Sequence, residues 1–192
     1  IVIWTTTPWT IPGNRALAVH NDIEYKSLNL KINDGNKNII IASDLVESFI
    51  KENKIEEYKV NFSIKGHELT NTFCKHTLYD SGYNFEVPIL HGDFVTTEQG
   101  TGIVHICPVH GMDDFILGKQ HDLELPMTIN ESGIYYDHIP VFNGQHIFKV
   151  DQNVCDEIKK NNNLISQGIL VHSYPHSWRS KAPLVYKNTS QW

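Results

Sequence analysis

The sequence predicts a mainly β protein of the α+β class, folded as a distorted β-barrel with a few short peripheral helices. Short apolar segments, several with every second residue apolar, dominate the first half of the chain. Helical periodicity is confined to three short segments. The 192 residues suffice for one domain with its own core. Together these observations favour a closed or nearly closed barrel decorated by helices.

The strand signals begin at the first residue. Residues 1–7 are apolar and β-branched, and we expect a buried strand there. Residues 28–32 and 59–64 alternate apolar and polar side chains, as half-buried strands do. The sequence NDGN at 33–36 is a turn, so residues 28–32 and the apolar run 39–42 should form a hairpin. In the segment 59–64, the positions expected to face the core are Val60, Phe62 and Ile64.

Helices are expected at residues 43–53, 111–121 and 151–161. The first has an apolar face, and the third brings Val154 and Ile158 together at i, i+4. The residues expected to cap them are Ser43 or Asp44 for the first helix and Asp151 for the third.

Charge and cysteine content exclude some classes of function. The formal net charge is −6, whereas a domain that binds nucleic acid by itself is usually basic. The three cysteines, Cys74, Cys107 and Cys155, are odd in number and widely spaced, which argues for a reducing compartment over a disulfide framework. No apolar run approaches the ~20 residues of a membrane span, and the start lacks a signal-peptide layout. Because the chain opens without methionine, in an apolar segment, we expect a fragment of a larger protein.

The first distinctive motif is WTTTPWTIPGN, residues 4–14. Its four threonines would suit a β-branched edge strand. The alternative is a pocket wall whose hydroxyls form hydrogen bonds with a polar ligand. The motif by itself does not decide between the two.

The second motif, GTGIVHICPVHGMDDF, spans residues 100–115. Gly100 and Gly102 allow tight backbone geometry, and IVHI reads as a short strand that leads through a loop into the second helix. Asp113 and Asp114 then lie in the first helical turn. Both acids could serve only the helix dipole, or one could face a cavity and pair with a substrate cation.

Other chemistry in this region finds little support. His105, alone in an apolar strand, fits a hydrogen-bonded core histidine better than a catalyst. A thiolate nucleophile built from Cys107 with His105 or His110 lacks a third, orienting group. The pairs Cys74–His76 and Cys107–His110 lack a second ligand pair at zinc-type spacing, so no metal site is predicted. Neither a P-loop nor a dinucleotide fingerprint is present.

The third motif, residues 172–192, mixes aromatic side chains with Arg179, Lys181 and Lys187. It suits a surface that faces nucleic acid or another domain. A purely structural strand pair returning to a parent domain fits equally well.

The three motifs, in this order, resemble the editing (connective peptide) domain of isoleucyl-tRNA synthetase, a class I aminoacyl-tRNA synthetase. The resemblance spans nearly the whole chain and implies one editing domain over residues 1–192, with about 172–192 returning toward the aminoacylation domain. The valyl and leucyl enzymes carry an arginine before the proline of the first motif and an acid after it. Thr7 and Trp9 stand there in this chain, which favours the isoleucyl type.

The resemblance implies hydrolysis of the ester of mischarged valyl-tRNA(Ile), with valyl-adenylate as a further candidate substrate. The pocket should admit valine and exclude isoleucine sterically, because tightly packed walls do not yield easily. The implied partners are the 3′ acceptor end of tRNA(Ile), the valine moiety and the other domains of a cytoplasmic parent enzyme, with no membrane. This domain needs no cofactor, whereas the parent uses ATP and Mg. The alternative is a non-catalytic module that receives the tRNA acceptor end or spaces two domains.

Residue roles follow from the same resemblance. Asp114 matches the aspartate that binds the α-ammonium group, and His105 matches the histidine whose bulk blocks the extra methyl group of isoleucine. Trp9 should wall the pocket. The implied reaction uses a positioned water and no covalent nucleophile, with Asp114, His105, Thr6 and Thr7 as the catalytic set. Cys107 departs from the family, which more often has a small residue there, and we expect only packing from it. The hydroxyls implied to hold the amino acid, the ribose and the water are those of Thr5, Thr6, Thr7 and Thr10.

Overall fold

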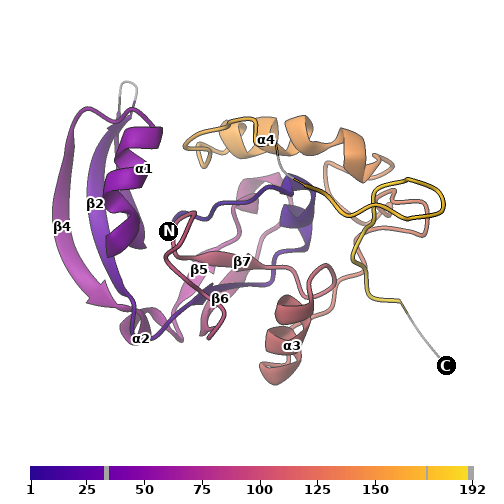
Figure 1. Cartoon of the computed structure of the whole chain (residues 1–192), viewed down its shortest axis with the longest axis horizontal. Coiled ribbons are helices and arrows are strands. Elements are labelled where there is room, and N and C mark those ends of the chain that lie inside the picture. Colours follow the sequence, from indigo (N-terminus) through magenta and orange to yellow (C-terminus); the bar gives the residue numbers. More distant parts are fainter. Residues whose placement is uncertain (33–34, 172, 190–192) are drawn as a thin grey trace.

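Two β-sheets with short helices around them make up the computed structural model, which describes residues 1–32, 35–171 and 173–189. One sheet has three strands in the order β3-β2-β4, and the other has four in the order β5-β6-β1-β7. Figure 1 shows the sheet that contains β2 and β4 at the left end of the molecule, beside the other sheet. The predicted class, mainly β with a few peripheral helices, is confirmed. The barrel expected from the sequence is not closed, because the named strands of the described residues pair within two separate sheets.

The three-stranded sheet contains the predicted hairpin. Strand β2 (Glu24–Ile32) pairs antiparallel with β3 (Gly35–Ala42) and with β4 (Tyr58–Lys65). Residues 33–34 of the predicted turn lie outside the described residues. A 3-10 turn, η2 (Ser43–Leu45), leads into helix α1 (Val46–Glu52), whose buried side chains pack on this sheet.

Strand β4 is confirmed as a strand, but the prediction that Val60 and Phe62 face the core is wrong, whereas Ile64 is partly buried and packs against the core as expected. Val60 is 42% exposed and Phe62 is 52% exposed. The reason is coverage by α1, whose apolar face packs against side chains of β2 and β3 in a cluster that contains no described side chain of β4. A register shift between Ser27 and Leu28 further alters which side chains of β4 face the core. The side chains of β2 and β3 in this cluster are Leu28, Leu30, Ile39 and Ile41.

The four-stranded sheet carries the second motif. Strand β1 (Ala16–Val19) is buried along its length, pairing parallel with β6 (Glu86–His91) and antiparallel with β7 (Val104–Ile106). Strand β5 (Phe73–Lys75) pairs with β6 at the other edge. The predicted IVHI strand is therefore confirmed as β7, and it lies beside the strand that directly follows the threonine motif. Two short helical turns, α2 (Gly66–Leu69) and η3 (Tyr79–Ser81), connect the strands β4, β5 and β6.

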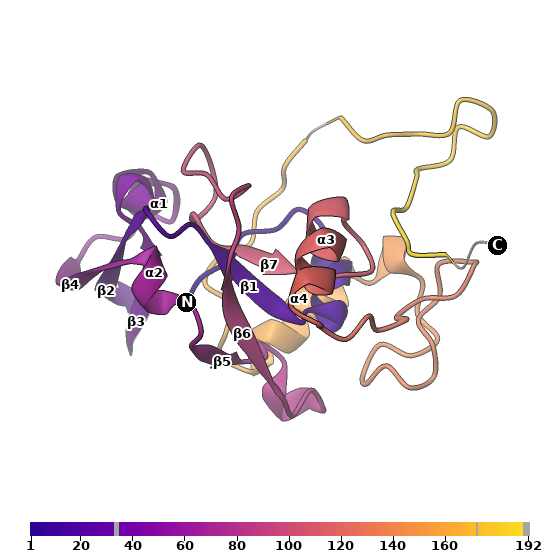
Figure 2. The same ribbon diagram turned by 90° about the horizontal axis from the view of Figure 1, so that it is seen from below.

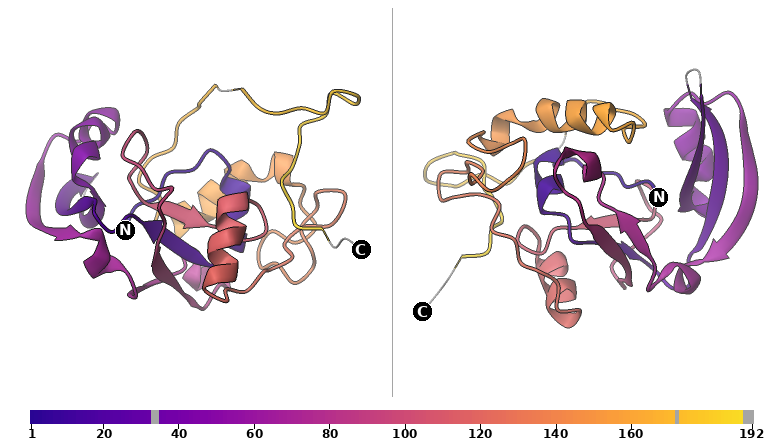
Figure 3. Two further views of the ribbon diagram at one scale, coloured as in Figure 1. Left: turned by 60° about the horizontal axis from the view of Figure 1, so that its bottom comes forward. Right: turned by 180° about the vertical axis from the view of Figure 1, so that it is seen from behind.

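The other predicted helices are present as α3 (Met112–Gln120) and α4 (Asp151–Lys160), the latter after a 3-10 turn, η4 (Ile147–Lys149). Figure 3 shows α3 and α4 on different sides of the four-stranded sheet. The cap predictions are wrong. The Ser43 hydroxyl donates to Glu24 Oε1 (3.0 Å), and Asp151 lies in the first turn of α4, after its N-cap Val150. Helix α1 begins after its N-cap Leu45, and neither this residue nor Val150 makes a side-chain hydrogen bond to its helix.

The N-terminal segment differs most from the prediction. Residues 1–7 form no strand, and Pro8–Gly13 form a 3-10 helix, η1. Thr5 Oγ1 accepts a hydrogen bond from the Thr7 backbone N–H (3.0 Å), a local bond that competes with a strand ladder. Pro8 then supplies a fixed φ at the helix start and lacks the N–H that pairing would need.

Two distant side chains hold η1 in place. The buried His76 donates from Nε2 to the Ile11 carbonyl (3.0 Å), and its Nδ1 accepts from the Leu78 N–H (3.1 Å). The Tyr135 hydroxyl donates to the Trp9 carbonyl. Trp9 and Ile11 themselves pack in one cluster with Val150 and Val154 at the start of α4. The wall that carries the threonine motif is thus fixed from several elements.

We expect Tyr135→Phe to lower the free energy of unfolding by about 1–3 kcal/mol, because the buried Trp9 carbonyl loses its partner. Chemical denaturation of this chain measures the effect. The matched control is Tyr58→Phe, which removes an exposed hydroxyl from Glu47 and should cost less than about 0.5 kcal/mol. Equal losses in the two variants would show that the Tyr135 bond does not hold η1.

Candidate functional site

A cavity of about 230 Å³ lies beside the threonine motif. Thr7, Trp9 and Thr10 form one wall, and His110 of the second motif adds to it. The C-terminal segment lines the remainder, through Ser173, Tyr174, Pro175 and Tyr186. Segments a hundred and more residues apart therefore meet at one small, partly apolar space.

The threonines of the motif separate into two groups. Thr7 and Thr10 line the cavity, whereas Thr5 and Thr6 are not among its lining residues. Thr5 Oγ1 lies 3.3 Å from Thr7 Oγ1, so the first hydroxyl shapes the loop that presents the second. The Thr6 side chain is exposed. Thr5 and Thr6 precede the cavity-lining residues in the sequence, and their roles in substrate binding stay predictions.

His105 is fixed by two hydrogen bonds to the first motif. The Asn14 amide nitrogen lies 3.3 Å from Nδ1, and Thr10 Oγ1 lies 2.9 Å from Nε2. An amide nitrogen only donates, so Nδ1 is the acceptor and Nε2 carries the proton. The Thr10 hydroxyl in turn donates a hydrogen bond to the Thr7 carbonyl (2.9 Å). Burial lowers the pKa of His105 to about 4, and the neutral tautomer that this chain of bonds requires therefore persists at neutral pH.

His110 is the second ordered imidazole of the site. Its Nδ1 donates to the Tyr186 carbonyl (2.9 Å), and its Nε2 accepts from the Thr128 hydroxyl (2.7 Å). The ring meets the edge of Trp9 at a centroid distance of 4.8 Å. Burial lowers the pKa of His110, although the bond to Tyr186 opposes the shift. His110 and Asn14 were missed as site residues, because their partners lie on segments whose proximity no local pattern reveals.

The structure distinguishes the two aspartates of the second motif. Asp113 is exposed, whereas Asp114 is half-buried and its Oδ2 accepts a hydrogen bond from the Cys107 N–H (2.7 Å). A side chain at Gly111 would collide with this carboxylate, so the glycine leaves room for it. Burial raises the pKa of Asp114 to about 6, against the lowering effect of its backbone hydrogen bonds. Asp114 is thus tied to the strand end that holds His105, although it is not among the residues that line the cavity.

Cys107 is unsuited to nucleophilic chemistry. Its thiol is buried, and burial raises the pKa of that thiol far above its usual range. A Cβ on Gly13 would lie 2.4 Å from Cys107 Sγ, so the thiol fills the space that this glycine leaves. Both neighbouring histidines are already hydrogen-bonded to other groups. Cys107 therefore acts as a packing residue here.

Within the described residues, no group of three or more His, Cys, Asp or Glu side chains could hold a metal ion. None of the helices in that part of the chain is long and apolar enough to cross a membrane.

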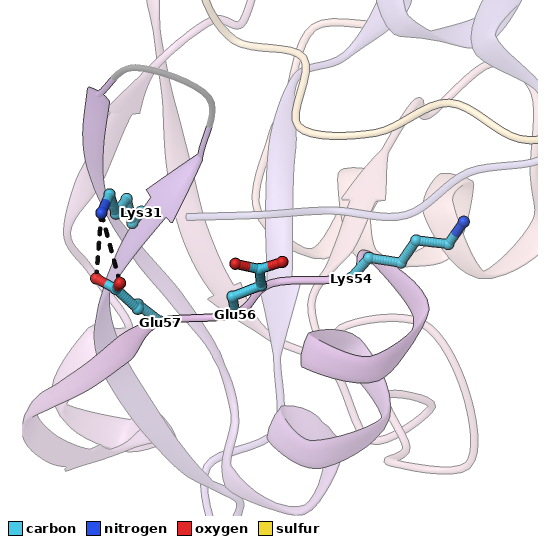
Figure 4. A pocket seen from close by; sticks show the side chains of 4 residues that line it. All are labelled: Lys31, Lys54, Glu56 and Glu57. Atoms are coloured by element: carbon cyan, nitrogen blue, oxygen red, sulfur yellow. Dashed lines mark hydrogen bonds and ion pairs between the residues drawn. The ribbon is translucent and has the colours of Figure 1, made fainter.

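A second cavity, also of about 230 Å³, lies beside the three-stranded sheet. Figure 4 shows its four lining side chains, with Lys31 paired to Glu57 (Nζ–Oε2 3.4 Å) and Lys54 directed away from them. Both members of the ion pair are exposed, and such pairs contribute little binding energy. This hollow lacks the apolar wall and convergent polar groups that typify a ligand site, so the cavity at the threonine motif is the stronger candidate. The lining residues are Lys31, Lys54, Glu56 and Glu57.

Comparison with known proteins shows which family the chain resembles over most of its length. Residues 1–175 match the family model described as the leucyl-tRNA synthetase editing domain. The isoleucine–tRNA ligase of Pelagibacter ubique is 47% identical over 195 residues, covering 100% of this chain and 21% of that protein. The enzyme of the same name from Gluconobacter oxydans is 41% identical over 210 residues, covering 100% and 22%. This chain thus spans about a fifth of the length of these curated relatives.

Solved structures share the fold at low sequence identity. The crystal structure of GlLeuRS-CP1 has a TM-score of 0.63 and 17% identity, with 90% of this chain and 83% of that chain covered. The cytosolic leucyl-tRNA synthetase editing domain of P. knowlesi has a TM-score of 0.58 and 15% identity, with 83% and 80% covered. The arrangement of two sheets and short helices is therefore that of synthetase editing domains.

The low pKa of His105 predicts how stability depends on pH. The unfolded chain takes up a proton near the ordinary value of 6.5, whereas folded His105 does so only near 4, so acid favours unfolding between these values. His76 acts in the same direction, while Asp114, with its raised pKa, opposes them by favouring the folded state in acid. We therefore expect the chain to lose stability as pH falls from 6.5 toward 4, and His105→Gln to reduce that loss by about 1–2 kcal/mol.

Urea denaturation at several pH values between 7 and 4.5 measures this difference. His121→Gln, which removes an exposed imidazole at the end of α3, is the control and should follow the unmodified chain. If His105→Gln and the control give the same pH profile, His105 titrates normally in the folded state.

Proposed function

The chain belongs to the family of aminoacyl-tRNA synthetase editing domains, with isoleucine–tRNA ligases as relatives, and we propose that it hydrolyses the ester of valyl-tRNA(Ile). Valyl-adenylate is a second substrate in this proposal. The observation that carries it is the junction of the two motifs: Thr10 and Asn14 hold His105 across more than ninety residues of sequence. A spacer domain would need no such polar junction beside a cavity.

The proposed reaction is direct attack by water on the ester carbonyl. An aminoacyl ester is reactive enough that positioning the water and stabilising the developing oxyanion suffice. The buried, protonated Cys107 thiol argues against a covalent intermediate. Thr7 lies at the cavity and Thr6 is exposed beside it, so these two hydroxyls are our candidates for holding the water and the terminal ribose. The reaction proposed for this domain involves no metal, and ATP and Mg serve the aminoacylation step of the parent enzyme.

Asp114 binds the α-ammonium group of the misattached amino acid in this proposal. With a pKa of about 6, the carboxylate is ionised at neutral pH and supplies a charge-assisted partner for a cation. The hydrogen bond from Cys107 N–H fixes its orientation, and a fixed acceptor loses little entropy when the substrate binds. Among the described residues, no such hydrogen bond from the strand end restrains the exposed Asp113.

His105 and its partners provide the size limit for the amino-acid side chain. Two hydrogen bonds prevent the imidazole from rotating away, and Trp9 and Thr10 on the cavity wall are buried. A wall of this kind resists the entry of one extra methyl group, because displacing packed side chains costs more than a lost contact. Valine is accepted and isoleucine refused on this basis.

The partners in this proposal are the 3′ acceptor end of tRNA(Ile) and the remaining domains of a cytoplasmic parent synthetase. The acidic chain, with a net charge of −6, has little means of holding a whole tRNA alone. The parent must therefore supply most of the affinity for the nucleic acid, and this chain supplies the hydrolytic pocket.

For Asp114→Asn in the full-length synthetase, we expect kcat/KM for valyl-tRNA(Ile) deacylation to fall about 10- to 100-fold, the value of a charge-assisted hydrogen bond. Asparagine can still accept from Cys107 N–H, so the local fold is kept. In the unmodified enzyme, kcat/KM should also fall as pH drops through about 6, where Asp114 becomes protonated, and the variant should lack this step.

Asp113→Asn is the matched control, because it removes the neighbouring exposed carboxylate from the same helical turn. Equal rates for the two variants would show that Asp114 does not bind the ammonium group. If the unmodified enzyme deacylates no faster than an enzyme lacking this domain, the chain is a non-catalytic module.

For His105→Ala, we expect correctly charged isoleucyl-tRNA(Ile) to become a substrate, because Thr10 on the cavity wall loses the imidazole that holds it. Deacylation of isoleucyl- and valyl-tRNA(Ile), measured side by side, should show their ratio rising at least about 10-fold. His121→Ala, outside the site, should leave the ratio unchanged. Discrimination that survives His105→Ala would assign the size limit to other residues.

A further inference from the structure

The C-terminal part of the chain differs in charge from the rest. Residues 161–192 contain three of the sixteen Lys and Arg residues and none of the twenty-two Asp and Glu residues. Lys187 is paired with Glu131 (2.6 Å), whereas neither Arg179 nor Lys181 forms an ion pair with a described acid. Two uncompensated cations therefore lie close together on an otherwise acidic protein.

These cations sit on an ordered turn, residues 176–183. A bridge between His176 and Pro183 closes the turn. The Ser177 N–H donates to the Ala182 carbonyl, and the Lys181 N–H donates to the Ser177 carbonyl, both at 2.9 Å. The Ser177 hydroxyl additionally accepts from the Ser180 N–H (3.2 Å). Figure 2 shows this turn at the far end of a segment that stands away from the two sheets.

Trp178 lies on the same turn and is 78% exposed. The guanidinium carbon of Arg179 lies 5.0 Å from the centroid of its ring. One face of the indole is thus next to a cation, and most of the side chain is left uncovered by the described residues of this chain. An exposed aromatic ring beside free cations is the combination by which proteins bind single-stranded nucleic acid, through base stacking and phosphate contacts.

The base of this segment is attached to the candidate site. Ser173, Tyr174, Pro175 and Tyr186 line the cavity, and the Asn188 N–H donates to the Val109 carbonyl (3.0 Å). A strand whose end occupies the cavity would pass these residues when it leaves in the direction of the turn.

We propose that the turn 176–183 binds the single-stranded RNA that precedes the aminoacylated nucleotide, with Trp178 stacked on a base and Arg179 and Lys181 at phosphates. This inference rests on the proposed function for its substrate. Tryptophan and arginine would also suit a protein surface of the parent enzyme, but the attachment of this segment to the candidate cavity favours the RNA strand. The acidic remainder of the chain repels phosphate and leaves this turn as the attractive surface.

The test compares two substrates of the full-length synthetase. For Trp178→Ala, KM for valyl-tRNA(Ile) should rise about 10-fold, in the range measured for base–aromatic stacking, with kcat unchanged. Hydrolysis of 3′-O-valyladenosine, which lacks the preceding strand, should not change. Trp178→Phe should restore most of the loss. Phe73→Ala, a control at another exposed aromatic residue (64% exposed), should behave as the unmodified enzyme.

Binding of uncharged tRNA(Ile), measured at several salt concentrations, tests the surface without hydrolysis. The double variant R179Q/K181Q should bind more weakly and lower the slope of log K against log salt by about 1 to 1.5, as expected for two phosphate contacts to a single strand. This readout holds even if the chain proves not to hydrolyse valyl-tRNA, so it separates this inference from the proposed function.

Three results would overturn the inference. Unchanged RNA affinity in both variants would exclude the surface. An equal loss on valyl-tRNA and 3′-O-valyladenosine would place Trp178 in the pocket instead. A lower melting temperature of the full-length enzyme with an unchanged salt slope would show that the turn packs against another domain.

Discussion

The capture of the η1 backbone by side chains from elsewhere is the constraint on which the site depends. A six-residue 3-10 helix with two prolines makes few hydrogen bonds of its own. The Ile11 and Trp9 carbonyls are instead bonded by His76 and by Tyr135, which lie outside η1. Because these partners come from separate elements, η1 keeps its position only when the whole domain is folded. Thr10 then meets His105, and Trp9 meets His110, in a fixed geometry.

Much of the fold follows from local patterns. The hairpin, the short strand of the second motif and all three predicted helices are present, since each depends on periodicity and turn residues. The strand expected at residues 1–7 failed, because β-branched composition does not reveal that Thr5 bonds to the next residues of its own backbone. The burial expected for Val60 and Phe62 failed for a different reason: alternation shows that a strand has two faces, but not whether a neighbour covers either one.

For the candidate site, the sequence predicted which motifs take part but not how their side chains are arranged. The sequence marked the threonine cluster, His105 and the aspartate pair, and a family resemblance was needed to choose Asp114 over Asp113. The structure supplies a physical basis for the choice, since only Asp114 reaches back to the end of β7. The hydrogen bonds of His110 to Thr128 and Tyr186 were beyond sequence reasoning, because each joins segments brought together only by the tertiary fold.

The contact between Gly13 and Cys107 limits the order in which these two positions can be substituted. The thiol lies where a side chain at position 13 would begin, with Thr128 close on another side. The space can therefore hold a side chain at position 13 or the thiol at position 107, but not both. A lineage that enlarges position 13 must first shorten position 107, because an intermediate with both side chains would push η1 away from His105. Gly13 and Cys107 are thus a sterically coupled pair, and a change at either position alters what the other can hold.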